Sequence, residues 1–236
     1  MAHSTLSRRL LAEFLGTAFL VAAVVGSGIA AARRSPSDSG LQLLENSIAT
    51  GAVLLALIVV FASVSGAHFN PVVTLVDREL TGAHRGETAA YIAIQILGGV
   101  CGAVAANAMF GLSAISISTT ARATSSTFLA EVIATFGLSL VIFGLVRGGR
   151  GAWVPVAVAG YITGAYWFTS STSFANPAVT IARVFSDTFA GIAPASVLPF
   201  VAAQLIGGLL AFFTIKFLWP QVQPTMIVAN LAREAS

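Results

Sequence analysis

The chain has 236 residues, of which 56% are hydrophobic and only 9% are charged. Soluble domains carry about 25% charged residues, so this composition excludes a soluble protein and indicates a chain that crosses a membrane several times. The formal net charge of +3 comes from basic residues scattered between apolar blocks, which argues against a nucleic-acid partner and favours contact with a lipid bilayer.

Six apolar segments approach or exceed the length of about 20 residues that a membrane span needs. The first could be mistaken for a secretory signal peptide because Arg8 and Arg9 precede it. Its apolar run is longer than a signal sequence uses and contains Glu13, so we expect a retained helix. The fifth segment is the shortest. The six expected spans are Leu6–Ala32, Leu43–Ser65, Ala89–Phe110, Phe128–Val146, Trp153–Thr169 and Pro194–Leu218.

Two further apolar segments, about Asn70–Val76 and Asn176–Phe185, are too short to cross a membrane. Each follows a long span and opens with Asn-Pro. Asparagine is a favoured helix N-cap, and proline at the first helical position presets the backbone angle. We therefore predict that Asn70-Pro71 and Asn176-Pro177 each begin a half-length helix. The non-helical backbone before each one must be buried in protein or line a cavity.

The sequence also repeats itself in order. "EFLGT" at Glu13 returns as "EVIAT" at Glu131, and "QILGG" at Gln95 returns as "QLIGG" at Gln204. Each half, about 6–110 and about 125–218, holds three spans. Because three is odd, the halves must lie in opposite orientations across the bilayer. The sequence therefore predicts one all-α membrane domain, 1–236, with six transmembrane helices, two re-entrant half helices and a site near the midplane.

The chemistry expected at that site follows from the two helix starts. Their positive dipole ends repel a cation, and the side-chain NH2 groups of Asn70 and Asn176 are left to donate into the lumen. Such a site passes small uncharged polar solutes. No nucleophile–base pair, cofactor motif or metal-ligand cluster stands out in the sequence, so we expect no enzyme activity and no cofactor. A secondary transporter is the alternative, because transporters also use inverted repeats and broken helices.

The motifs "SGAHFNPVVT" (Ser65–Thr74) and "NPAVT" (Asn176–Thr180), with the paired repeats, resemble the aquaporin and aquaglyceroporin superfamily over about Leu6–Leu218. The resemblance implies a homotetramer with one pore in each subunit. It also implies that Glu13 and Glu131 are buried and hold the re-entrant loops by hydrogen bonds, with a proton relay as the rival role. His68 is expected to support its loop, and pH modulation of the pore is the alternative.

The sequence departs from the family pattern at the pore. Val72 stands in the first motif where the family usually has alanine, whereas Pro177-Ala178 follow the pattern in the second. The arginine that the family places three residues after the second asparagine is replaced by Val179. Offsets from the motifs give the outer selectivity filter, which is expected to be wide enough for polyols as well as water. A strictly water-selective channel is the alternative. The expected filter residues are Thr50, Gly164, Ser173 and Val179.

Arg183 lies four residues beyond Val179, about 6 Å further along a helix axis. It is a candidate for the outer vestibule, although a solvated arginine at the membrane edge is the more ordinary interpretation. "NPAVTIAR" followed by "FSDTFAGI" is similar to bacterial aquaporin-like proteins associated with arsenic resistance. This similarity implies passage of neutral arsenite, As(OH)3.

Counting the basic residues predicts the orientation in a bacterial inner or cell membrane. With the N-terminus inside, eight basic residues fall on the cytoplasmic side and four on the outer side, which favours two cytoplasmic termini. The eight are Arg8, Arg9, Arg78, Arg85, Arg147, Arg150, Lys216 and Arg233, and the four are Arg33, Arg34, Arg122 and Arg183.

Overall fold

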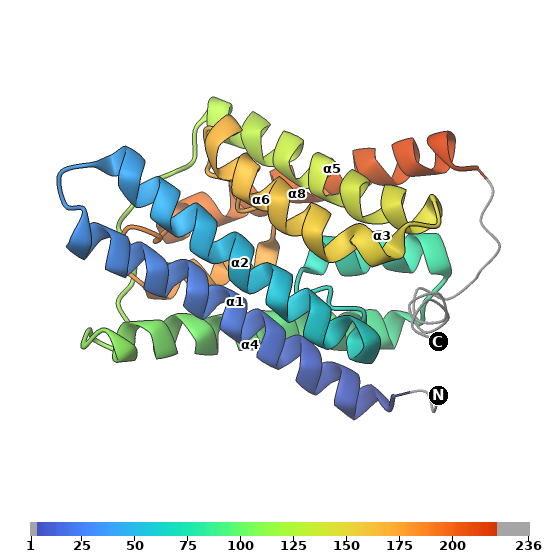
Figure 1. The fold of residues 1–236 in the computed structure, drawn as a ribbon, viewed down its shortest axis with the longest axis horizontal. Coiled ribbons are helices and arrows are strands. Elements are labelled where there is room, and N and C mark those ends of the chain that lie inside the picture. Colours follow the sequence, from blue (N-terminus) through green and yellow to red (C-terminus); the bar gives the residue numbers. More distant parts are fainter. Residues whose placement is uncertain (1–3, 221–236) are drawn as a thin grey trace.

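The computed structural model describes residues 4–220 and contains no strand within them, which confirms the all-α prediction. Arg233, which entered the orientation count, lies outside the described residues. A short 3-10 turn, η1 at Gly151–Trp153, precedes α6, and a second, η2 at Arg183–Phe185, follows α7 (Figure 1). The α-helices are α1 Leu6–Arg34, α2 Ser39–Ser65, α3 Pro71–Thr81, α4 Arg85–Met109, α5 Ser125–Arg147, α6 Val154–Phe168, α7 Pro177–Ala182 and α8 Pro194–Leu218.

Five of the helices are long and apolar enough to cross a membrane: α1, α2, α4, α5 and α8. The sixth expected span is α6, whose 15 residues reach about 22 Å at 1.5 Å per residue. That is shorter than a hydrocarbon core of about 30 Å. The 3-10 turn at Gly151–Trp153 extends α6 at its start. The expected span is therefore present, with a helix shorter than the other five.

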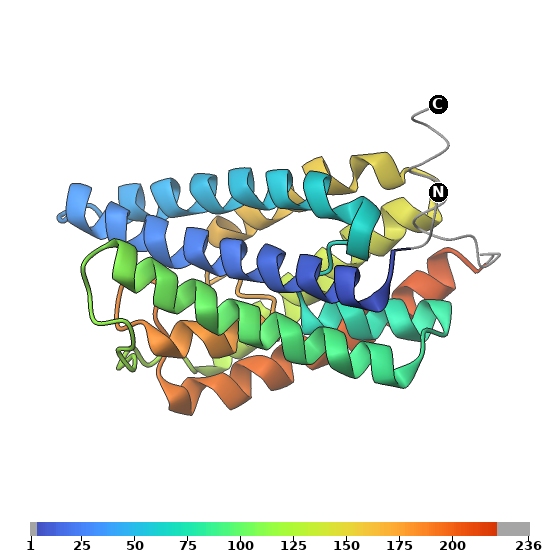
Figure 2. The same ribbon diagram turned by 90° about the horizontal axis from the view of Figure 1, so that it is seen from below.

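The bundle consists of two similar halves. In the first half, α1 packs against both α2 and α4, and in the second α5 packs against both α6 and α8. The long helices run along the long axis of the molecule (Figure 2). The halves meet where α2 packs against α6. This arrangement repeats the order of the sequence motifs, since Glu13 and Glu131 lie on α1 and α5, and Gln95 and Gln204 lie on α4 and α8.

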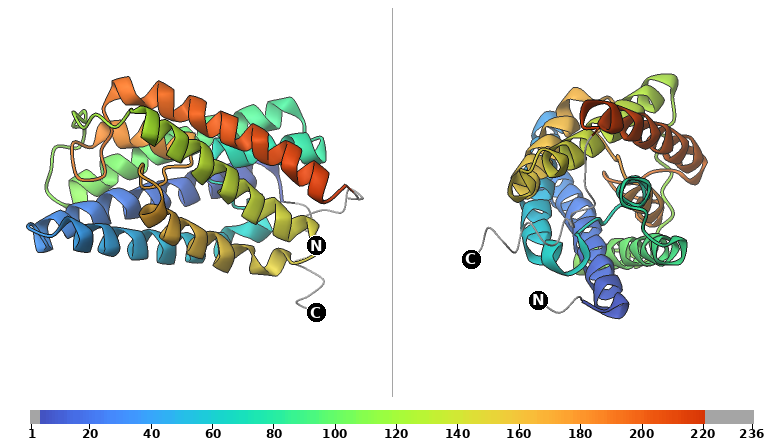
Figure 3. Two further views of the ribbon diagram at one scale, coloured as in Figure 1. Left: turned by 90° about the horizontal axis from the view of Figure 1, so that it is seen from above. Right: turned by 90° about the vertical axis from the view of Figure 1, so that its right-hand side faces the viewer.

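The two half helices fill the interior between these halves. Viewed along the bundle axis, α3 is seen end-on among the longer helices (Figure 3, right). It packs against α4 and α8, and α7 packs against the same two helices. The predicted extent of the first half helix is wrong at its end, because α3 continues to Thr81, where Gly82 stops it in a left-handed conformation.

The bundle has two ends. The start of α1 and the end of α8 lie together at one end, which we call the terminal end (Figure 1). The opposite end, which we call the loop end, contains the end of α1 and the segments 111–124 and 186–193. Segment 111–124 is tied to η2 by backbone hydrogen bonds from Ser116 to Phe185 and from Ser118 to Val184, and to segment 186–193 by one from Ala193 to Thr120.

Candidate functional site

Each Asn-Pro pair begins a helix in the predicted way. The side chain of Asn70 accepts a hydrogen bond from the backbone N–H of Val72 at 2.9 Å. Asn176 accepts from Ala178 at 2.9 Å and from Val179 at 3.3 Å. Proline occupies the first turn of both helices. Local capping chemistry therefore fixes where both half helices start.

The two helix starts also touch each other. The amide Nδ2 of Asn70 donates to the carbonyl of Ala175, and Nδ2 of Asn176 donates to the carbonyl of Phe69, each at 2.8 Å. The expectation that both NH2 groups are free for the lumen is therefore wrong for one hydrogen of each. The physical reason is that each loop presents a carbonyl just before its asparagine, and the other half's amide satisfies it. Asn176 lines the central cavity, whereas Asn70 does not.

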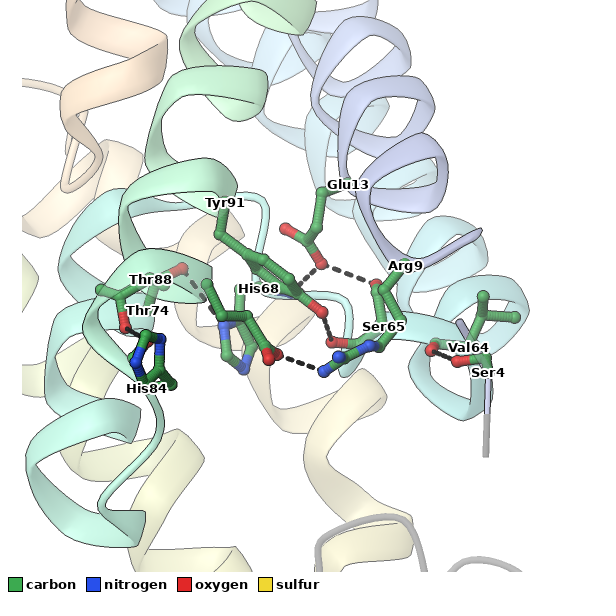
Figure 4. A network of polar contacts seen from close by, with 11 residues as sticks. Ser4, Arg9, Glu13, Val64, Ser65, His68, Thr74, His84, Thr88 and Tyr91 are labelled. Carbon is green, nitrogen blue, oxygen red and sulfur yellow. Dashed lines mark hydrogen bonds and ion pairs between the residues drawn. The ribbon is translucent and has the colours of Figure 1, made fainter. Parts of the chain in front are cut away.

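A buried carboxylate on α1 holds the first loop. Oε1 of Glu13 accepts from the Ser65 hydroxyl at 2.6 Å and from the His68 N–H at 3.0 Å. Oε2 accepts from the Phe69 N–H at 2.7 Å and from the Gln95 amide at 2.8 Å. Figure 4 shows Glu13 pointing toward Ser65 and the loop that carries His68. Four donors are thus satisfied by one side chain.

Glu131 on α5 repeats this arrangement. Oε1 accepts from the Ser171 hydroxyl at 2.6 Å and from the Phe174 N–H at 2.8 Å. Oε2 accepts from the Ala175 N–H at 2.8 Å and from the Gln204 amide at 2.6 Å. The repeated glutamines, noticed in the sequence only as repeats, are therefore partners of the repeated glutamates. Their paired order along the chain is the signal that pointed to them.

Each loop contains non-glycine residues in the left-handed region. Ala67 and Phe69 have φ of 52° and 48°, and Ser173 and Ala175 have φ of 51° and 47°. This conformation costs roughly 1–2 kcal/mol per residue. It turns the N–H groups of Phe69 and Ala175 toward the glutamates, which accept their hydrogen bonds. The buried carboxylates therefore offset the strain of the loops.

A cavity of about 400 Å³ runs through the bundle. Its terminal end lies beside the turn between α5 and α6, and it extends to Arg183 near the loop end. The re-entrant loops contribute the polar His68, Ser173 and Asn176 to its lining, together with apolar residues such as Phe69 and Phe174. The long helices supply mostly apolar side chains, among them Leu20, Val24, Leu54, Ile58, Leu138, Ile142, Val158 and Ile162.

Three of the four expected filter residues line this cavity: Thr50, Ser173 and Val179. Thr50 Oγ1 lies 3.1 Å from the hydroxyl of Tyr166, which also lines the cavity. Ser173 Oγ is buried and has no hydrogen-bond partner among the described residues. His68, half-buried, lines the cavity toward the terminal end, and its Nδ1 lies 3.1 Å from Thr74 Oγ1.

The expectation that Gly164 belongs to the filter is wrong. Gly164 is exposed on the outer side of α6, and a Cβ at this position would meet nothing within 4 Å. Ile162 and Tyr166 line the cavity instead. A shift of two residues rotates a position by about 200° around an α-helix, because the helix has 3.6 residues per turn. Counting an offset from Asn176 therefore selected the opposite face.

The interpretation of Arg183 as a solvated arginine is also wrong. Arg183 is 3% exposed, lines the cavity and donates from Nε to the carbonyl of Ala190. Its guanidinium carbon lies 3.4 Å from the centroid of the Phe174 ring. Phe174 was not expected at the site, and its place directly after Ser173 is the only signal in the sequence. Arg183 therefore belongs to the cavity, as the vestibule alternative required.

The unusual Val72 has a packing explanation. Val72 is buried, and a Cβ added to Gly208 on α8 would lie 2.4 Å from its Cγ1. In the other half, Gly99 on α4 faces the Ala178 carbonyl and the Ala182 side chain. Because Gly208 has no side chain, it leaves space for Val72, which is larger than the alanine usual in the first motif.

Comparison with known proteins gives three findings. The family model described as "Major intrinsic protein" matches residues 1–164. The chain is 45% identical to aquaglyceroporin AqpS of Rhizobium meliloti over 224 residues, which cover 95% of each chain. It is 30% identical to aquaporin AqpM of Methanothermobacter marburgensis, covering 91% of this chain and 98% of that one.

A solved structure has the same fold. The X-ray structure of the aquaglyceroporin from Plasmodium falciparum superimposes with a TM-score of 0.72. The match covers 92% of this chain and 98% of the other, at 22% sequence identity. The half helices, the paired glutamates and the cavity described above therefore lie in a fold with a known relative.

Proposed function

Because the chain belongs to the major intrinsic protein family, we propose that it forms a passive membrane channel for small uncharged solutes. The proposed cargo includes water, polyols of the size of glycerol and neutral metalloid acids such as As(OH)3. The channel is proposed to lie in a bacterial inner or cell membrane as a homotetramer, with both termini in the cytoplasm. The printed name of the relative from Rhizobium meliloti, an aquaglyceroporin, supports the polyol part of this proposal.

The observation that carries the proposal is the lining of the cavity, which is mostly apolar with a few polar groups. A polyol has hydroxyl groups on one side and C–H groups on the other. The re-entrant loops offer Asn176 and the Ser173 hydroxyl, which has no partner among the described residues, to the former, and the long helices offer apolar surface to the latter. The meeting of two helix N-termini raises the energy of a cation at the centre. Uncharged solutes are therefore favoured over ions.

The width of the filter depends on Val179. Valine lacks both the charge and the long side chain of arginine, so we propose that solutes larger than water pass this level. A strictly water-selective channel is the competing function, and Tyr166 is the observation that favours it, since its buried ring and hydroxyl occupy the same region as Thr50.

The test compares water, glycerol and As(OH)3 permeability in reconstituted vesicles by stopped-flow light scattering. Wild type should pass all three, and Val179→Arg should lose the larger solutes while keeping water. Val179→Leu is the matched control, because it adds bulk without charge and should reduce the flux only in part. A wild-type protein that passes water alone would refute the wide filter. A rate that saturates at low solute concentration would point to a transporter.

A further inference from the structure

The Nη edge of the Arg183 guanidinium makes no hydrogen bond within the described residues. Its Nε donates to the Ala190 carbonyl, and one face stacks on Phe174. Neither Nη atom has a hydrogen-bond partner among residues 4–220, and neither is sealed from the cavity that Arg183 lines. An arginine so deeply buried would normally use these donors. The unused edge of the fork therefore faces the cavity.

No carboxylate forms a direct ion pair with Arg183 within the described residues, although the charge of Glu131 favours the charged guanidinium from a distance. The ion pairs found there, Arg9–Glu87 and Arg78–Glu79, involve neither Arg183 nor Arg122. Both carboxylate oxygens of Glu131 accept two hydrogen bonds from other donors. Asp187, four residues after Arg183, accepts from the backbone and hydroxyl of Thr119 instead.

A second arginine, Arg122, lies near the same Phe174 ring. The guanidinium carbon of Arg122 is 5.4 Å from the Phe174 centroid. Its nitrogens donate to the carbonyls of Gly191 at 2.6 Å and Phe189 at 2.8 Å. Burial lowers the pKa of the Arg122 guanidinium from its ordinary value, and the nearby Tyr166 partly offsets that shift. The loop end of the cavity thus combines two guanidinium groups, neither of which has a direct ion-pair partner within the described residues.

A buried charge without a direct ion-pair partner has a large desolvation cost, which a counter-ion reduces. The planar guanidinium fork matches two oxygens of one oxyanion, as it does in bidentate carboxylate pairs. The Ser173 hydroxyl, which is buried and has no partner within the part of the chain that the structure describes, lines the same cavity and adds a donor. We propose that the loop end of the cavity is a binding subsite for a small monovalent oxyanion, held by the Nη edge of Arg183.

The subsite has a functional consequence, which rests on the proposed channel function. An anion bound at Arg183 occupies the loop end of the path that neutral solutes use, so it competes with them. It does not pass through readily, because the cavity beyond Arg183 is lined mostly by apolar residues, among them Val179 and Val24, which cannot replace its water. Small oxyanions are therefore inhibitors of solute flux.

The experiment uses nitrate as the probe, since it is planar, monovalent and has no protonated form near neutral pH. Glycerol flux is measured in vesicles with nitrate on both sides, and chloride, which has no pair of oxygens for the fork, replaces nitrate at constant ionic strength in the reference. Nitrate binding is measured separately by the thermal unfolding midpoint of the detergent-solubilised protein, because a ligand that binds only the folded state raises it. The variants are Arg183→Gln, Arg183→Lys and Arg33→Gln.

Arg33 is the matched control because it also stacks on a phenylalanine, Phe110, at the loop end but is exposed. We expect nitrate to raise the midpoint of wild type and Arg33→Gln. Their flux should fall about twofold at a nitrate concentration equal to the dissociation constant derived from the dependence of the midpoint on nitrate. Arg183→Gln should lose both effects. Arg183→Lys, which keeps the charge but not the fork, should show weaker binding and remains informative if the glutamine variant does not fold.

Two results would refute the proposed oxyanion subsite. One is the absence of any nitrate shift in wild type, and the other is inhibition of Arg183→Gln as strong as that of wild type. The proposed channel function fails in a different way, namely as a lack of glycerol flux in chloride. The binding measurement does not depend on flux, so the two failures are distinguishable.

Discussion

Replacing Glu131 by glutamine tests the role of the buried carboxylate in the second half. The carboxylate accepts four hydrogen bonds, two at each oxygen. Glutamine keeps one accepting oxygen and turns the other atom into a donor that faces two donors. Two buried donors therefore lose their acceptor, at about 1–3 kcal/mol each, so we expect a loss of about 2–6 kcal/mol in the free energy of unfolding.

The measurement is thermal unfolding of the purified protein in detergent. For a chain of this size, 1 kcal/mol shifts the midpoint by about 2–4 °C, so even the low end of the expected loss lowers it by about 4 °C. Glu13→Gln should give a similar fall, because Glu13 also accepts four hydrogen bonds. Glu79→Gln is the control, since Glu79 is exposed and pairs only with its neighbour Arg78, a contact worth about 0–1 kcal/mol.

The two glutamates should differ in their effect on flux. The loop that Glu131 holds carries Ser173 and Phe174, which line the cavity near its loop end, so Glu131→Gln should change the ratio of glycerol to water permeability. Glu13 holds the other loop and should change this ratio less. A midpoint for Glu131→Gln that falls no further than that of Glu79→Gln would refute the hydrogen-bond reasoning.

Two further predictions concern packing and the face of α6. Gly208→Ala should lower the unfolding midpoint because its Cβ would lie 2.4 Å from Val72 Cγ1. Val72→Ala in the same molecule should restore part of the loss, with a coupling of about 0.5–3 kcal/mol, and strictly additive effects would contradict this contact. Gly164→Trp should leave glycerol flux in vesicles unchanged since the residue faces outward, whereas Ile162→Trp should reduce it strongly. The reverse result would restore Gly164 to the filter.

The starts of the half helices could be predicted because their cause is local. Asn-Pro caps and initiates a helix within three residues, and the structure has both helices beginning at the expected prolines. The order of the repeated motifs could also be predicted, because it can be read directly from the sequence. Long apolar runs predicted the spans, with α6 shorter than the rest.

The partners of the asparagines were decided by the tertiary structure. The carbonyls that accept from Asn70 and Asn176 belong to residues 105 and 107 positions away along the chain. Nothing near either asparagine in the sequence indicates that its amide is already used. The same holds for Val72 and Gly208, whose fit depends on α3 lying against α8.

The face of α6 that lines the cavity was also beyond the reach of sequence. In a soluble protein, the buried and exposed faces of a helix differ in polarity, and the period of that difference identifies them. Here lipid lies outside and a largely apolar lumen wall lies inside, so both faces of α6 are hydrophobic and Gly164 could not be told from Ile162 or Tyr166. Arg183 is the converse case. From the sequence, a charged residue near a membrane edge is expected to be exposed to solvent. Only the tertiary contacts of Arg183 with Phe174 and the Ala190 carbonyl place its side chain in the cavity.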